Sequence, residues 1–304
     1  MKLSATILAV AAATLFVSGA MAQDKIQIGD KMVFPESITT TSDGTLYAGS
    51  FTTGAVFKAA PGAATTTQFI APQTEGATGV IGVYADEKAG LLWVCNSDPG
   101  AFSGQGKFPA VARSYALADG SAKASYPLGD GSFCNDFVST ADGTVYVADT
   151  SGGKVDVIKA GGTTADQWLA DKALAGVDGI SIGKDGALYV NNVMTGKLYR
   201  IAINADGSAG ALTEIATSSP LKGPDGMRFG DDGVLYLAEN GAGQVDALTI
   251  NGDKADVKVL KGGFDTPTAV SKVGKTLWVG EAKFSKLGGK EDPGLFYAYA
   301  VPLQ

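Results

Sequence analysis

Histidine is absent from this chain of 304 residues. Its absence excludes a Ser-His-Asp triad, a Cys-His pair and a histidine zinc site. Acid–base chemistry can then come only from carboxylates, tyrosine, lysine or a metal-bound water. A metal site built only from oxygen ligands remains available, and such sites select hard cations.

Basic residues and long apolar runs are also scarce. Lysine and arginine number 24 against 31 aspartates and glutamates, a net charge of −7, whereas phosphate binding needs a basic face. We therefore expect no nucleic-acid partner. The apolar stretch ILAVAAATLFV follows Lys2, is too short to span a bilayer and precedes Ala20-Met21-Ala22. These features predict a signal peptide over residues 1–22, cleavage after Ala22, no membrane span and a periplasmic or secreted protein.

An internal repeat dominates the rest of the sequence. Four times, an acidic or amide residue lies seven positions before an Asp-Gly pair, and a run containing one tyrosine follows the pair. The runs are TLYAGS, TVYVADT, ALYVNN and VLYLAEN, and they predict half-buried strands. The four polar residues are Glu36, Asn135, Asp178 and Asp225. Asp-Gly pairs suit tight hairpin turns, so we interpret the turn aspartates as structural.

The repeat continues in two units that lack the polar residue, where Ile81 and Pro267 stand at the equivalent place. A period of about 40 to 50 residues with several short strands per unit is typical of a β-propeller blade. Six units predict an all-β fold, a six-bladed β-propeller formed by residues 23–304 as one domain. The last unit lacks a fourth strand, so we expect residues near Lys25–Gly29 to pair with residues near Leu295–Val301 and close the ring.

In a closed ring, the four polar side chains would meet at one spot. Taken alone, each of these side chains is best explained as a polar group in water that caps the start of its own strand. Three converging carboxylates, however, would not stay ionised together without a cation, because two unit charges about 4 Å apart repel by roughly 4 kcal/mol at an effective dielectric constant near 20. The pattern therefore predicts one bound divalent cation, with Ca²⁺ first and Mg²⁺, Mn²⁺ or Zn²⁺ as alternatives.

Four segments carry a resemblance to a known family. FPESITTTSDGTLY, NDFVSTADGTVYVAD, VDGISIGKDGALYV and PDGMRFGDDGVLYLAENGAGQV resemble the senescence marker protein (regucalcin)/gluconolactonase family of six-bladed propellers. The resemblance covers most of residues 23–304. It implies a divalent ion at the top of the central tunnel, held by Glu36, Asp178 and Asp225. It also implies that Asn135 lies at or near the same shell of ligands.

Two positions depart from that family's pattern. Gluconolactonase-like members place an arginine two residues before the asparagine of the third unit to hold a sugar-acid substrate, and here that position is Phe133. Many members carry asparagine at the middle ligand position, where this chain has Asp178. The first departure argues against sugar lactones as substrates. The second adds negative charge, which should tighten cation binding.

Two long loops are predicted beside this site. They begin at Ser97 in the second unit and at Ala282 in the sixth, the two units without a polar ring residue. Long loops often carry function, so we interpret them as walls of a substrate cavity, the alternative being plain solvent loops. The candidate apolar contacts to substrate are Phe102, Phe108, Phe133 and Phe284.

Cysteine occurs only twice. Cys95 ends a predicted strand of the second unit, and Cys134 begins the first strand of the third. Both map to the face that carries the polar residues, on neighbouring blades. In an oxidising compartment a disulfide is expected there rather than a reactive thiol, so we predict a Cys95–Cys134 disulfide.

The leading functional hypothesis is a metal-dependent hydrolase of lactones or related esters, whose ion polarises the substrate carbonyl and stabilises the oxyanion. The resemblance implies Asp225 as general base as well as ligand, with Asp136 or Asp178 as second choices. The alternative is a non-enzymatic periplasmic binding or scaffold propeller with a structural ion, because a fold does not determine a function. A carbon–nitrogen condensing activity of the strictosidine synthase kind is a more distant third.

Overall fold

The computed structural model describes residues 23–72, 79–100 and 105–304. Regular structure in these ranges is almost entirely β-strand, and the 3₁₀ segments η2 (Lys172–Leu174) and η3 (Phe284–Lys286) have three residues each. No helix in the same ranges is long and apolar enough to cross a bilayer. The predicted signal peptide, residues 1–22, lies outside the described residues.

The strands form four sheets of four strands and one sheet of eight. One sheet has the order β2 (Pro35–Thr40), β3 (Leu46–Ser50), β4 (Val56–Ala59), β5 (Thr67–Ile70). A second has the order β6 (Gly79–Asp86), β7 (Leu91–Ser97), β8 (Val111–Ala116), β9 (Ala122–Pro127). A third has the order β10 (Cys134–Ser139), β11 (Val145–Asp149), β12 (Lys154–Ile158), β13 (Asp166–Ala170).

The eight-stranded sheet consists of two antiparallel halves. Its order is β14 (Val177–Ile182), β15 (Leu188–Asn192), β16 (Lys197–Ile203), β17 (Ala209–Thr217), β21 (Lys254–Gly262), β20 (Gln244–Asn251), β19 (Leu235–Glu239), β18 (Pro224–Phe229). A short parallel pairing of β17 with β21 joins the halves, with Ala216 opposite Lys254 and Thr217 opposite Ala255.

The last sheet combines the two ends of the described chain. Its order is β1 (Lys25–Ile28), β24 (Phe296–Pro302), β23 (Thr276–Glu281), β22 (Pro267–Val273). β1 pairs antiparallel with β24, with Lys25 opposite Tyr299 and Ile28 opposite Phe296. The predicted pairing of the N-terminal segment with the last strand is confirmed. It covers a strand edge that would otherwise be open.

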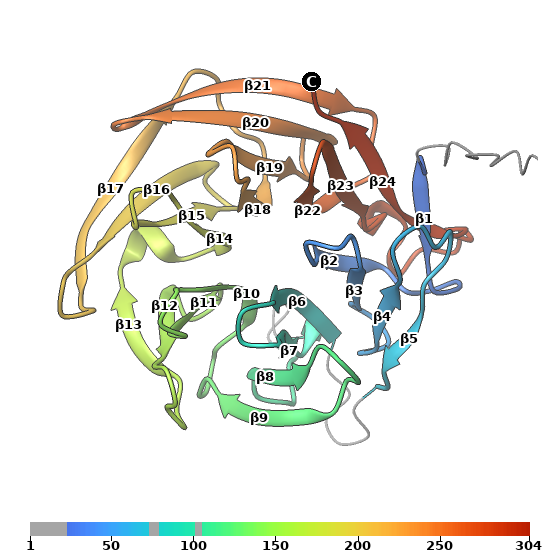
Figure 1. The fold of residues 1–304 in the computed structure, drawn as a ribbon, viewed down its shortest axis with the longest axis horizontal. Coiled ribbons are helices and arrows are strands. Elements are labelled where there is room, and N and C mark those ends of the chain that lie inside the picture. Colours follow the sequence, from blue (N-terminus) through green and yellow to red (C-terminus); the bar gives the residue numbers. More distant parts are fainter. Residues whose placement is uncertain (1–22, 73–78, 101–104) are drawn as a thin grey trace, which may run out of the picture.

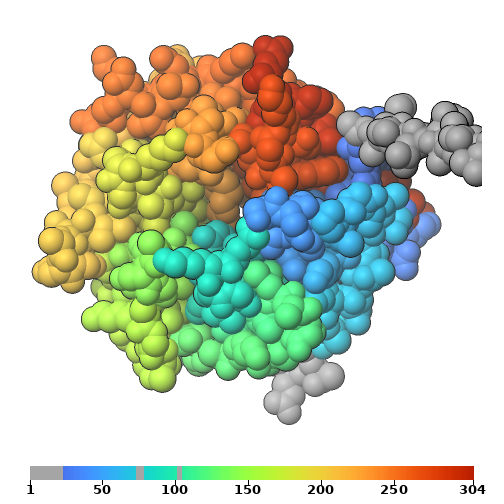
Figure 2. Space-filling view, viewed as in Figure 1, coloured from blue at the N-terminus to red at the C-terminus, as the bar shows by residue number. Residues whose placement is uncertain are grey.

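The first strands of successive groups contact one another in a circle. The contacting pairs are β2–β6, β6–β10, β10–β14, β14–β18, β18–β22 and β22–β2. In Figure 1 these strands lie innermost, and β5, β9, β13 and β21 lie at the periphery. Figure 2 shows the chain following the same circle, with its last segments in red against its first segments in blue.

Apolar clusters fill the spaces between neighbouring sheets. Ile28, Phe34 and Phe296 belong to the cluster between the last sheet and the β2–β5 sheet. Burying each such side chain stabilises the fold by roughly 1.5–3 kcal/mol. Because both faces of each sheet are covered, β3, β11, β15 and β19 are buried at every residue. The prediction that these strands are half-buried is therefore wrong.

The Asp-Gly turns have the structural role that the sequence indicated. Asp185 Oδ1 accepts a hydrogen bond of 3.2 Å from the backbone N–H of Ala187, and Asp185 Oδ2 accepts one of 3.0 Å from the Tyr189 hydroxyl. Gly186 has a φ of 77°, which glycine adopts without a steric penalty. The aspartates of the other three turns also accept a backbone N–H two residues later.

Candidate metal centre

A register shift interrupts the first strand of each polar unit at the polar position. The shifts lie between Pro35 and Ile38, between Cys134 and Phe137, between Val177 and Ile180, and between Pro224 and Met227. A β-bulge of this kind bends the strand and re-aims a side chain. The residues in these bulges include all four polar residues of the repeat.

The polar residues of the repeat converge. Glu36, Asp178 and Asp225 each offer a carboxylate oxygen, and these three atoms all lie within 4.8 Å of one another. The three side chains are buried and come from β2, β14 and β18. Asn135 joins them from β10, because its Nδ2 donates hydrogen bonds of 3.0 Å to Asp178 Oδ2 and to Thr150 Oγ1. Below, Glu36, Asp178 and Asp225 are called the carboxylate triad.

Burial disfavours the charged forms of the triad. It raises the pKa of Glu36 well above its ordinary value, and the charges of Asp225 and Asp178 raise it further. Burial and then the charge of Asp225 raise the pKa of Asp178 in the same way. Burial also raises the pKa of Asp225, to about 7, against hydrogen bonds that lower it. Without a cation, the triad therefore retains protons at a pH where isolated carboxyls are ionised.

The donor set fits a divalent cation. Asp178 Oδ1 is buried and has no hydrogen-bond partner among the described residues. A buried carboxylate oxygen without a partner costs free energy, which a bound cation would remove. All the donors of the triad are oxygens, the atoms that Ca²⁺ and similar hard cations prefer. Glu36, Asp178 and Asp225 would hold the ion, with the Asn135 amide beside them.

Two asparagines that the sequence analysis did not identify hold Asp225 in place. Asn240 Nδ2 donates a hydrogen bond of 2.8 Å to Asp225 Oδ2, and the backbone N–H of Gly226 donates one of 2.8 Å to Oδ1. Asn191 Nδ2 donates to the Asp225 carbonyl oxygen at 2.5 Å. Asn191 lies two residues after the tyrosine of ALYVNN and Asn240 four residues after that of VLYLAEN, so no shared place in the repeat marked them.

Neighbouring first strands approach too closely for a side chain just after the triad positions. A Cβ added at Gly179 would lie 2.5 Å from the Asp225 carbonyl oxygen and 2.9 Å from Asn191 Nδ2. A Cβ added at Gly226 would lie 2.6 Å from the Thr268 carbonyl oxygen. Glycine at these positions lets β14 pack against β18, and β18 against β22, close enough for the triad to converge.

Asp136 follows Asn135 in β10 and is held by an ion pair. Arg228 Nη2 donates to Asp136 Oδ1 at 2.6 Å, and Arg228 Nη1 donates to Oδ2 at 2.6 Å. The backbone N–H groups of Phe137 and Ile180 donate to the same two oxygens at 2.8 and 3.2 Å. Since each oxygen already accepts two hydrogen bonds, the geometry favours an anchoring role for Asp136 over the predicted role of alternative base.

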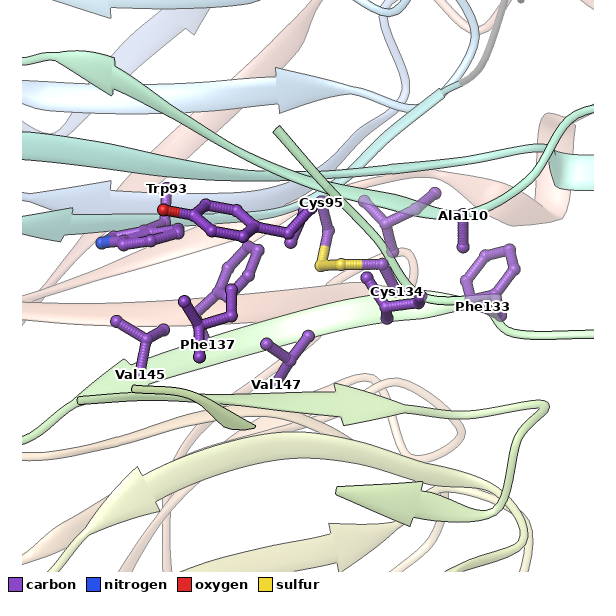
Figure 3. Close-up of a cluster of buried hydrophobic side chains, with 13 residues drawn as sticks. Trp93, Cys95, Ala110, Phe133, Cys134, Phe137, Val145 and Val147 are labelled. Atoms are coloured by element: carbon purple, nitrogen blue, oxygen red, sulfur yellow. A yellow bond between two sulfur atoms is a disulfide. The ribbon is translucent and has the colours of Figure 1, made fainter. Parts of the chain in front are cut away.

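Phe133 does not face a substrate cavity. It is 1% exposed and belongs to the apolar cluster between the β6–β9 and β10–β13 sheets. Figure 3 shows it beside Ala110 in this cluster. The prediction that Phe133 contacts substrate is corrected by this burial, because the ring has almost no open surface.

The other predicted phenylalanines differ in their surroundings. Phe284 lies in η3 and packs against Phe51 and Phe34, with ring centroids 5.0 and 6.5 Å away. Phe108 is 42% exposed and lines a cavity of about 390 Å³ together with Ser151. Phe102 lies outside the described residues. Of the three that the structure describes, Phe108 therefore has the surface most open to a ligand.

Cys95 and Cys134 form the predicted disulfide, with Cα atoms 5.2 Å apart. Both cysteines are fully buried in the cluster of Figure 3, where the bridge is drawn in yellow. The bridge links β7 to β10, and Cys134 directly precedes Asn135. The disulfide therefore holds the strand that presents the amide of the candidate metal centre.

No family model and no curated protein matches this chain. Solved structures match its fold. A calcium-binding regucalcin from Agrobacterium tumefaciens has a TM-score of 0.65 and 16% identity, over 92% of this chain and 95% of that one. A gluconolactonase from Xanthomonas campestris has a TM-score of 0.63 and 15% identity, over 93% of each chain. A virginiamycin B lyase from Staphylococcus aureus has a TM-score of 0.60 and 17% identity, over 84% of this chain and 80% of that one.

These comparisons and the sheet order define a propeller-like all-β protein. Among such proteins, the chain resembles regucalcin and gluconolactonase in fold, as the sequence motifs indicated. At these low identities the likeness shows the fold alone, so the function must be argued from the site.

Proposed function

We propose that the ring is a six-bladed propeller and that the protein is an exported, divalent-metal-dependent hydrolase of lactones or related esters. The blade count treats the two halves of the eight-stranded sheet as separate blades, because only two residue pairs join β17 to β21. The buried disulfide supports export to an oxidising compartment.

The buried carboxylate triad carries the functional proposal. Glu36, Asp178 and Asp225 come from three separate strands and bring carboxylate oxygens within 4.8 Å of one another, and Asp178 Oδ1 has no hydrogen-bond partner among the described residues. A bound cation there would polarise a substrate carbonyl and stabilise the charge that develops on its oxygen. The exposed ring of Phe108, from the long loop after β7, supplies an apolar contact for the non-reacting part of a substrate.

Asp225 is the residue that we assign as general base. Asn240 Nδ2 and the Gly226 backbone N–H each donate to one of its two oxygens and orient them, as a positioned base requires. It would accept the proton of the attacking water on a carboxylate oxygen. Asp136 is unsuited to this step because Arg228 engages both of its oxygens.

The absence of histidine argues against the chemistry of the virginiamycin B lyases. A virginiamycin B lyase of similar fold is described as catalytically inactive when one histidine is replaced by alanine. This chain contains no histidine at all, so it cannot use the same residue type. Hydrolysis through a metal and a carboxylate base needs none.

A non-enzymatic binding propeller with a structural Ca²⁺ ion is the second candidate. It is favoured by Phe133, which replaces the arginine that the resemblance predicts and is buried in an apolar cluster. No cationic side chain therefore projects from that position toward a sugar acid. The triad would then hold an ion that stabilises the ring while the long loops bind a partner.

Hydrolysis assays distinguish the two candidates. The metal-loaded protein is tested on aliphatic, aryl and sugar lactones, with and without EDTA. Asp225→Asn should lower kcat roughly 10²-fold or more at saturating metal, because the base is lost. Asp178→Asn should mainly weaken cation binding and keep activity at saturating metal. The exposed Asp256→Asn is the matched control for loss of one charge. Equal loss in the Asp225 and Asp178 variants would contradict the assignment of the base, and hydrolysis of no ester would favour the binding propeller.

A further inference from the structure

A second polar layer lies directly beneath the carboxylate triad. Arg228 lies three residues after Asp225 in β18, and Asp136 directly follows Asn135 in β10. The two side chains form a two-pronged ion pair, with both N–O distances at 2.6 Å. The exposed fractions are only 15% for the Arg228 side chain and 6% for that of Asp136.

This layer ties together four of the innermost strands. Arg228 Nη1 also donates to the Ile180 carbonyl oxygen at 2.8 Å, and the Ile180 backbone N–H donates to Asp136 Oδ2 at 3.2 Å. Ile180 lies two residues after Asp178 in β14. The Arg228 guanidinium carbon lies 5.4 Å from the ring centroid of Tyr84, in β6. The ion pair therefore contacts β6, β10, β14 and β18, and each contacting residue follows the repeat position of its own strand by one to three residues.

A separate cavity lies on the far side of this layer. It has a volume of about 340 Å³, and its lining includes Arg228, Tyr84, Thr40 and Ser271. The triad residues are not part of that lining. Arg228 thus lines this cavity and at the same time donates hydrogen bonds to Asp136.

The layer also balances charge. The triad and Asp136 together offer four carboxylates, and the charge of Asp136 raises the pKa values of Glu36, Asp178 and Asp225. The guanidinium of Arg228 remains protonated at every accessible pH and offsets the charge of Asp136. If either partner is removed, the other is left as an uncompensated charge beneath the site.

We propose that the Arg228–Asp136 pair supports the strands that carry the carboxylate triad and that its balanced charge sets the cation affinity of the triad. This inference rests on the proposed metal site. It makes Asp136 and Arg228 positioning residues that act through the triad without binding the ion. The direction of the change in cation affinity therefore depends on whether Asp136 or Arg228 is replaced.

Calorimetric titration with CaCl₂ tests the proposal in the full-length mature protein. Asp136→Asn leaves the Arg228 charge unbalanced and should weaken Ca²⁺ binding by roughly tenfold or more. The double variant Asp136→Asn/Arg228→Gln removes both charges and should return the affinity to within about threefold of wild type. Arg228→Lys keeps the charge and should also bind within about threefold.

The outcomes separate this inference from the proposed function. If the double variant binds as weakly as Asp136→Asn, or Arg228→Lys is as weak as Asp136→Asn, then charge balance is refuted while the metal site stands. If wild type binds no Ca²⁺, Mg²⁺ or Mn²⁺, the metal site itself fails. Circular dichroism and thermal unfolding in EDTA establish which variants are folded. If the double variant does not fold, the Ca²⁺ affinities of Arg228→Lys and Asp136→Asn decide whether charge balance sets the affinity of the triad.

Discussion

Removal of divalent cations should destabilise this protein, and the loss should grow as the pH rises. In the unfolded chain, the triad carboxyls release their protons near pH 4. In the ion-free folded protein they keep them to higher pH, because burial and mutual repulsion raise their pKa values. The folded state therefore binds more protons than the unfolded state between about pH 4 and 7. Its free energy of unfolding falls as the pH rises through this window.

The size of the effect follows from the site. Two unit charges 4.8 Å apart, the upper limit for the triad oxygens, repel by about 3.5 kcal/mol at an effective dielectric constant near 20. For Asp225 alone, the rise in pKa from 3.8 to about 7 corresponds to about 4 kcal/mol lost by the ion-free protein above pH 7. A cation at 100 times its dissociation constant adds about 2.7 kcal/mol. For a domain of this length, that raises Tm by about 5 °C.

Thermal unfolding in EDTA and in CaCl₂ at pH 5, 6, 7 and 8 checks this prediction. The calcium-dependent rise in Tm should increase with pH, because the cation binds the deprotonated carboxylates. It should nearly vanish in a Glu36→Gln/Asp178→Asn variant and remain in Asp256→Asn, which removes one carboxylate at an exposed position. A Tm that is independent of calcium at every pH would refute the reasoning, as would a calcium effect that shrinks as the pH rises.

Two further predictions concern the elements that bring the triad together. Gly179→Ala, whose new Cβ would meet the Asp225 carbonyl oxygen at 2.5 Å, should lower the free energy of unfolding by about 1–3 kcal/mol and weaken calcium binding. Gly262→Ala is the control in denaturant titration, because a Cβ added there would have no neighbour closer than 3.9 Å. Equal losses of stability in the two variants would contradict the argument from close approach. Replacing Cys95 and Cys134 by alanine removes a bridge between residues 39 positions apart. The free energy of unfolding should fall by about 4 kcal/mol on the chain-entropy model. An unchanged denaturation midpoint in the variant without the disulfide would contradict this prediction.

The ligand set of the candidate site could be predicted because it repeats. Glu36, Asn135, Asp178 and Asp225 share one offset from a turn, and equivalent positions of a closed ring meet whatever the side chains between them. The disulfide and the pairing of β1 with β24 were predicted for similar reasons, since strand ends of neighbouring units lie together and a missing strand must be supplied.

Other features of the site could not be predicted, because they depend on distances across the ring. The ion pair of Arg228 with Asp136 joins residues 92 positions apart in sequence that share no repeat position. Phe133 was expected at a substrate cavity, but it fills the space between two sheets. The buried character of β15 also arises only when two neighbouring sheets cover it.

The sequence by itself therefore determined which residues are equivalent, where the turns lie and which strand completes the last sheet. Each of these follows from local chemistry: Asp-Gly pairs form turns, apolar runs form strands, and repeated units pack alike. Only the tertiary structure decided that bulges aim three carboxylates within 4.8 Å of one another and that Asp178 Oδ1 has no hydrogen-bond partner in the described part of the chain. Side-chain direction and burial there are set by contacts between strands more than 40 residues apart, and no local pattern encodes those contacts.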